Sequence, residues 1–191
     1  MEEMNIRKTL ISHIATLKLA TKGRIVEELG LCQGAGRIDV AVINGHFIGY
    51  EIKSERDTLK RLNSQIINYQ KIFDKITLVT TERHAQKAVE AVPESWGILL
   101  AIKKRTGIHL KAIRRATYND SIDPTALVQL LWRDEAADLL KRFGVTSGLS
   151  KMDRETLWRN VLEVVPSNEL KMQVSNAIIT RQYWRSGQQQ T

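Results

Sequence analysis

Cysteine, proline and aromatic residues are all scarce in this chain of 191 residues, which has one cysteine, three prolines and 6% aromatics. The single Cys32 excludes an intrachain disulfide framework and any zinc site built from several cysteines. So little cysteine fits a reducing compartment, and we therefore expect a cytoplasmic protein. The hydrophobic fraction of 42% is enough for one ordinary domain with a buried core, which disfavours a disordered chain.

Long apolar runs are also missing. None approaches the ~20 residues that a membrane-spanning helix needs. The first ten residues carry too many charges for a secretory signal. We therefore expect neither a membrane protein nor an exported one.

Acidic residues are outnumbered by basic ones, 21 to 29, which gives a net charge of +8 and a pI near 9.7. An acidic partner is therefore favoured, and DNA is such a partner. Most of the excess positive charge lies after residue 100, and the window 103–115 contains no acid. This window predicts contact with a phosphate backbone, although a solvated surface would have the same composition. The side chains expected to make that contact are Lys103, Lys104, Arg105, Arg114 and Arg115.

Hydrophobic periodicity predicts a mixed α/β core. Apolar residues at three- and four-residue steps indicate helices, and alternating or β-branched runs indicate strands. Asn44-Gly45 is the dipeptide best suited to a two-residue turn between two such strands. In chain order we expect a helix over 5–20, strands over 24–31, 37–43 and 47–53, a helix over 58–73, a strand over 76–80, a helix over 85–92 and a strand over 96–102.

The second part of the chain has a helical pattern. Asp123-Pro124 provides an N-cap followed by proline in the first helical turn. Helices are expected over 126–143, 153–164 and 168–184. We accordingly divide the chain into a core at 1–117, a small helical region at 118–185 that could bind nucleic acid, and a disordered tail at 186–191.

Two carboxylates and an ammonium group are expected to meet on the predicted hairpin. Glu51 and Lys53 are two apart on one strand and share a face, and Asp39 joins them if the strand register places it there. Carboxylate oxygens suit Mg²⁺, which also takes a phosphate oxygen of a substrate. A nearby lysine could orient the attacking water or stabilise charge on phosphorus. Taken alone, such residues more often line the solvent face of a strand.

Three ordered motifs resemble the PD-(D/E)XK nuclease superfamily. Asp39 ends a Gly-Arg-Ile-Asp sequence, and Glu51 and Lys53 frame a Glu-Ile-Lys element. Gln65 and Tyr69 frame a Q-x-x-x-Y motif similar to that of the RecB-type branch. The first 140 residues or so also resemble small bacterial and phage members of unknown role. The resemblance implies a restriction-endonuclease-like fold, in which helices flank a central mixed β-sheet in the order α-β-β-β-α-β.

The resemblance also implies a role for each matching residue. Asp39 and Glu51 would bind Mg²⁺, for which Mn²⁺ could substitute, and Lys53 would be the catalytic lysine. Glu28 would be a further metal ligand or would orient a water, with Glu27 as the alternative, because one residue of register decides which carboxylate points inward. Supporting and DNA-contacting roles would fall to Gln65, Tyr69 and Arg37.

Together these expectations predict a metal-dependent deoxyribonuclease that hydrolyses DNA phosphodiester bonds. The resemblance implies that its products carry a 5′-phosphate and a 3′-hydroxyl. One alternative is a DNA-binding module that keeps the fold without cleaving. Another is a protein-interaction subunit whose basic surface meets an acidic protein. A homodimer or a partner protein would suit cleavage of both strands by one site per chain.

Overall fold

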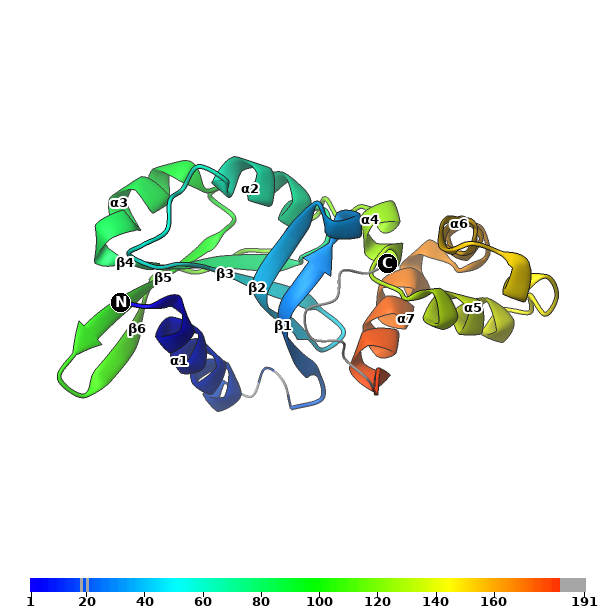
Figure 1. Ribbon diagram of the computed structural model, residues 1–191, viewed down its shortest axis with the longest axis horizontal. Coiled ribbons are helices and arrows are strands. Elements are labelled where there is room, and N and C mark those ends of the chain that lie inside the picture. The colour runs from blue at the N-terminus through cyan, green and yellow to red at the C-terminus, as the bar shows by residue number, and fades with distance from the viewer. Residues whose placement is uncertain (18, 20, 183–191) are drawn as a thin grey trace.

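A six-stranded β-sheet lies at the centre of the structure, a computed structural model that describes residues 1–17, 19 and 21–182 (Figure 1). The strands follow one another across the sheet in chain order. They are β1 (Arg24–Leu31), β2 (Gly36–Ile43), β3 (Phe47–Lys53), β4 (Lys75–Thr81), β5 (Gly97–Lys104) and β6 (Gly107–Arg114).

The sheet is mixed. Strands β1, β2 and β3 form an antiparallel meander, β3, β4 and β5 are parallel, and β6 returns antiparallel to β5. The hairpin predicted around Asn44-Gly45 is confirmed, because β2 and β3 pair up to Ile43↔Phe47 and Gly45 takes φ 91°. Its turn has three residues, 44–46, rather than the expected two. The predicted fold class, a mixed α/β sheet flanked by helices with a helical region after it, is confirmed.

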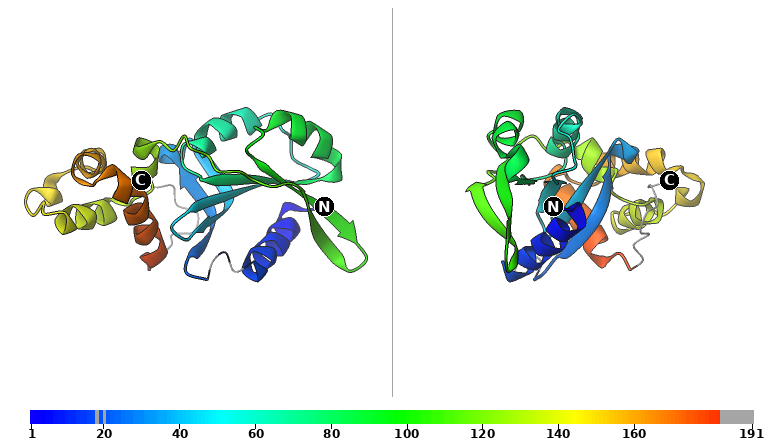
Figure 2. Two further views of the ribbon diagram at one scale, coloured as in Figure 1. Left: turned by 180° about the vertical axis from the view of Figure 1, so that it is seen from behind. Right: turned by 60° about the vertical axis from the view of Figure 1, so that its left-hand side comes forward.

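Helices cover both faces of this sheet. Helix α1 (Glu3–Thr16) lies on one face, and the two crossover helices α2 (Leu62–Gln70) and α3 (Glu82–Ala91) lie on the other (Figures 1 and 2). Helix α1 buries Ile6, Leu10 and Ile14, which recur at four-residue spacing, against the sheet. These contacts fix the rest of α1, including its polar side chains, over β2 and β3.

A helical region extends from the β1 end of the sheet, away from β5 and β6 (Figure 1). Its contact with the sheet is apolar and continuous with the core, and the buried Asp74 carboxylate adds an ion pair of 2.8 Å to Lys171. The division of the chain at residue 117 stays a prediction. The helices are α4 (Pro124–Val128), α5 (Arg133–Arg142), α6 (Arg154–Val164) and α7 (Ser167–Thr180).

The helices expected over 5–20 and 58–73 are shorter in the structure, as α1 and α2, and two other expected elements differ in kind. The helix expected over 126–143 is two helices, because Trp132 is extended and its N–H donates to the Glu135 carboxylate to start α5. The basic window after residue 102 contains the strand β6, which pairs with β5. The helix expected over 168–184 ends earlier, at Thr180, and the tail at 186–191 lies outside the described residues. Within the described part of the chain, no helix is long and apolar enough to span a membrane.

Candidate functional site

The candidate site lies where the ladder between β2 and β3 ends, at the pair Val40↔Tyr50. Beyond this pair Asp39 leaves the ladder, and one of its carboxylate oxygens instead accepts the Ile52 N–H at 2.6 Å. A cavity of about 900 Å³ opens here between the sheet, α1 and α2. The hairpin residues predicted to converge do so, since Asp39, Glu51 and Lys53 all line this cavity.

The Glu51 carboxylate is buried and fully hydrogen-bonded. Its Oε1 accepts from the Lys53 ammonium and from the Gln65 amide, each at 2.6 Å. Its Oε2 lies 2.7 Å from the Tyr69 hydroxyl. Glu51 and Lys53 are only 2% and 5% exposed, so this ion pair is shielded from water on the α2 side of the site.

Tyr69 belongs to the core rather than to the surface. Its ring stacks on Trp96 at a centroid distance of 6.1 Å, and its hydroxyl also lies 2.6 Å from the Arg37 carbonyl. Burial, and then the Glu51 charge, raise the pKa of the Tyr69 hydroxyl. A ring in this position cannot stack on a nucleic-acid base unless the core opens, so Tyr69 orders Glu51 in this structure.

Arg7 is the residue of this site that the sequence motifs do not point to. It projects from α1, is 7% exposed, and its guanidinium contacts the carboxylates of Glu3 and Glu28 and, at 3.2 Å, that of Asp39. Burial alone would lower the pKa of Arg7, but these carboxylates raise it overall. In the sequence, Arg7 is indicated only by its four-residue spacing from Glu3, which places both side chains on one helical face.

Glu28 is the β1 carboxylate that joins the cluster. Its backbone has φ 56°, which is unusual for a residue other than glycine, and its side chain meets Arg7 and, at 2.6 Å, Arg37. Glu27 points farther away, with 3.9 Å to Arg7 and a side chain 53% exposed. Oxygens of Glu3, Glu28 and Asp39 lie within 4.8 Å of one another, and we call these three residues with Arg7 the Arg7 cluster.

The pKa of Asp39 is set by its burial and by the charges around it. Burial raises the pKa of Asp39 to about 7, and the Glu51 charge adds to this effect. The Ile52 N–H and the Arg7 guanidinium lower the pKa of Asp39 and so oppose this effect. Asp39 therefore changes its charge near neutral pH, whereas Arg7 stays positive.

The predicted Mg²⁺ does not fit this arrangement while its contacts persist. The Arg7 guanidinium reaches the oxygens that a metal ion would need on the α1 side, and both Glu51 oxygens have partners on the α2 side. The Arg7 guanidinium thus offsets part of the negative charge of these carboxylates. Metal binding at Asp39, Glu51 and Glu28 stays a prediction.

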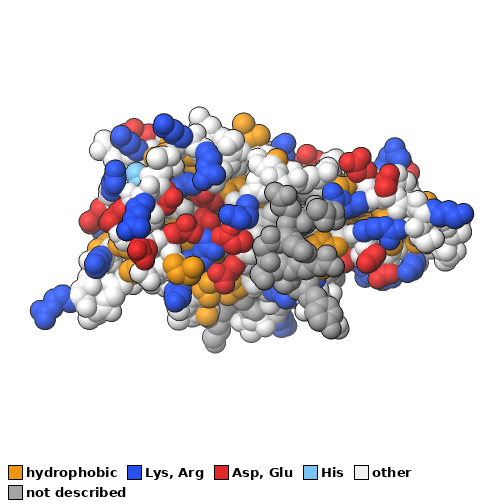
Figure 3. All heavy atoms as spheres, viewed as in Figure 1, with side chains coloured by type: hydrophobic (Ala, Val, Ile, Leu, Met, Phe, Trp, Pro, Cys, Tyr) orange, Lys and Arg blue, Asp and Glu red, His pale blue; other side chains and the backbone are white. Residues whose placement is uncertain are grey.

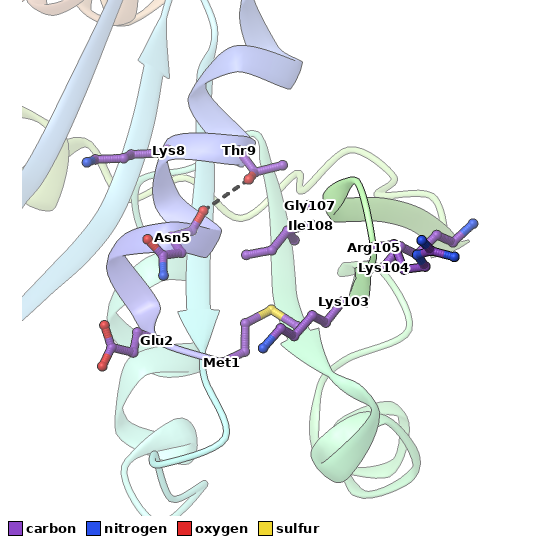
Figure 4. A pocket seen from close by; sticks show the side chains of 10 residues that line it. All are labelled: Met1, Glu2, Asn5, Lys8, Thr9, Lys103, Lys104, Arg105, Gly107 and Ile108. Atoms are coloured by element: carbon purple, nitrogen blue, oxygen red, sulfur yellow. Dashed lines mark hydrogen bonds between the residues drawn. The ribbon is translucent and has the colours of Figure 1, made fainter.

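The basic residues predicted to contact phosphate lie elsewhere, on the β5–β6 hairpin. Lys103, Lys104 and Arg105 are exposed at its tip, beside a cavity of about 690 Å³ between the hairpin and α1 (Figure 4). Figure 4 shows Lys104 and Arg105 pointing away from α1. Arg114 is held at the base of the hairpin, where it donates to the carbonyls of Trp96 and Pro93 at 2.7 and 2.9 Å. Arg115, the last residue predicted to contact phosphate, is exposed just after β6.

Comparison with known proteins connects the whole chain to a phage protein. The family model described as bacteriophage P4 protein cII matches residues 1–190. Protein cII of Enterobacteria phage P4 is 24% identical over 180 residues, which are 94% of this chain and 66% of the relative. The chain therefore spans about two thirds of that relative's length. No solved structure matches the chain.

These matches correct the sequence-based function. The assignment to the PD-(D/E)XK nuclease superfamily is wrong, and the predicted Mg²⁺-dependent deoxyribonuclease, and with it the prediction of an enzyme, are wrong as well. In the structure, the Arg7 guanidinium contacts Glu28 and Asp39, two of the three carboxylates predicted to bind the metal ion. The family model covers nearly every residue, and the chain therefore belongs to the bacteriophage P4 protein cII family.

Proposed function

We propose that this chain is a non-catalytic DNA-binding protein whose β5–β6 hairpin contacts the phosphate backbone. The observation that carries the proposal is a basic two-stranded ribbon that projects from the sheet with no acid between residues 103 and 115 (Figures 1 and 3). Such a ribbon is narrow enough to enter the major groove of DNA. Phosphate contacts from its lysines and arginines would supply affinity through counterion release.

The hairpin register distributes these cations around the tip. Lys103 pairs with Ile108 and Lys104 with Gly107, so the two neighbouring lysines point to opposite faces of the ribbon. Arg105 follows in the turn, where Gly107 takes φ 123°. Cations on both faces and at the tip would meet phosphates on both sides of a groove.

The ribbon is held in place along one face and at its base before any ligand arrives. Ile108 and Leu110 pack against the apolar cluster of α1, and Arg114 is tied to two backbone carbonyls. A rigid ribbon loses little conformational entropy on binding, which favours affinity. The arrangement also leaves Lys111, on the ribbon face opposite Leu110, exposed for a further contact.

Fluorescence anisotropy of a labelled DNA duplex, measured over a series of salt concentrations, tests the proposal. The triple variant Lys103→Ala/Lys104→Ala/Arg105→Ala should bind more weakly, and the slope of log affinity against log salt should fall in magnitude by roughly 2.7, about 0.9 for each lost contact. The matched control is Lys141→Ala/Arg142→Ala/Lys151→Ala, which removes the same charge from exposed positions of the helical region. The control should keep the wild-type slope.

Two results would contradict the proposal that the hairpin binds DNA. An equal loss in both variants would mean that net charge, or the helical region, governs binding. An absence of salt-dependent DNA binding in the wild-type protein would instead favour an interaction with an acidic protein. DNA as a partner also fits the cytoplasmic location expected from the sequence.

A further inference from the structure

The Arg7 cluster joins a buried guanidinium to three partly exposed carboxylates, and DNA binding by the hairpin does not use it. It lies within the β1–β2–α1 part of the molecule, whereas the hairpin tip projects beyond α1 (Figure 1). Figure 3 shows acidic and basic side chains interleaved on this face. The question is which cation these carboxylates are arranged to hold.

The contacts of Arg7 identify that cation. One guanidinium nitrogen, Nη2, lies against three carboxylates, those of Glu3, Glu28 and Asp39. The other terminal nitrogen, Nη1, faces a fourth carboxylate, that of Glu27, at 3.9 Å, while Nε is buried without a hydrogen-bond partner. A planar guanidinium suits such a convergence, since it stays charged at all relevant pH values and donates in several directions.

The rest of the site adds little unbalanced negative charge. Glu51 is paired with Lys53 at 2.6 Å, and Glu28 has a second cation in Arg37 at 2.6 Å. Mg²⁺ or Mn²⁺ would have to displace a buried guanidinium and would leave it without a partner, which is costly in a site of low dielectric constant. The contacts of the Arg7 guanidinium with these carboxylates therefore favour Arg7 over a divalent ion.

We infer that Arg7 is the resident cation of this carboxylate cluster and that it excludes a divalent metal ion from Glu3, Glu28 and Asp39. The carboxylates then serve to hold α1 against β1 and β2. Removal of the Arg7 charge would leave their oxygens, already within 4.8 Å of one another, able to bind a divalent ion.

Mn²⁺ binding, followed by the loss of the electron paramagnetic resonance signal of free Mn²⁺ at pH 8, tests this inference without any assay of activity. The wild-type protein and the control Lys8→Met, which removes an exposed charge from the same helix, should show no saturable binding below millimolar Mn²⁺. Arg7→Met should bind one Mn²⁺ at least tenfold more tightly than the wild type. Arg7→Lys keeps the charge and should resemble the wild type.

Asp39→Asn combined with Arg7→Met should abolish the new binding, which would place the ion at the cluster. Tight Mn²⁺ binding by the wild-type protein would overturn the inference, even if Arg7→Met failed to fold. A folded Arg7→Met protein, shown by circular dichroism, that binds no Mn²⁺ would overturn it too. Neither result depends on whether the hairpin binds DNA.

Discussion

Replacing Asp39 by asparagine should make the stability of the protein less dependent on pH between about 4 and 7. The pKa of Asp39 is raised from 3.8 to about 7, first by burial and then by the Glu51 charge. In this pH window the folded chain holds a proton that the unfolded chain has released, so rising pH favours unfolding. The stabilising contribution is therefore complete below about pH 3.8 and is lost as the pH passes 7.

The size of this effect follows from the shift. One pKa unit corresponds to 1.36 kcal/mol, so the free energy of unfolding of the wild type should fall, relative to Asp39→Asn, by up to roughly 4 kcal/mol across the window. Urea unfolding at half-unit pH steps from 4 to 8 measures this difference, which should level off above pH 7. A constant difference would refute the reasoning. A rise in the stability of the wild type relative to Asp39→Asn with increasing pH would mean that Arg7 and the Ile52 N–H outweigh burial.

Two further substitutions test the packing. Gly49→Ala should destabilise the fold by about 1–3 kcal/mol, because the added Cβ would lie 2.4 Å from the Ile38 Cδ1 and 3.1 Å from the Phe73 ring. An unchanged midpoint of urea unfolding would show instead that these side chains move aside without cost. Lys171→Met should lower the free energy of unfolding by about 1–2 kcal/mol, because the buried Asp74 carboxylate would keep only a backbone N–H hydrogen bond and the His46 ring at 3.8 Å. Asp74→Asn in the same background should recover part of the loss.

Most of the sheet could be predicted because each strand has its own local signal. Alternating side chains and the Asn44-Gly45 turn specify the β2–β3 hairpin without help from the rest of the fold. Strand β6 was not predicted, because its many lysines and arginines are equally typical of a solvated loop. Its apolar residues Ile108 and Leu110 nevertheless alternate with polar ones, as a strand requires. The break before α5 depends on a capping interaction of Glu135 that apolar periodicity does not register.

The site could be predicted only in part. The hairpin register brings Asp39, Glu51 and Lys53 to one cavity, and helical spacing brings Gln65 to Glu51. Arg7 could not be found in this way, because its contacts depend on how α1 packs across β1 and β2. The function inferred from the motifs was wrong because carboxylates and a lysine at these spacings do not specify which cation holds them together.

Site-specific photo-crosslinking tests the central claim, that the β5–β6 hairpin binds DNA, most directly. A benzophenone amino acid at Thr106, exposed in the hairpin turn, should crosslink to a labelled DNA duplex, and raised salt should abolish the product. The same group at Thr146, exposed in the turn after α5, should give no crosslink. Crosslinking at Thr146 but not at Thr106 would contradict the account.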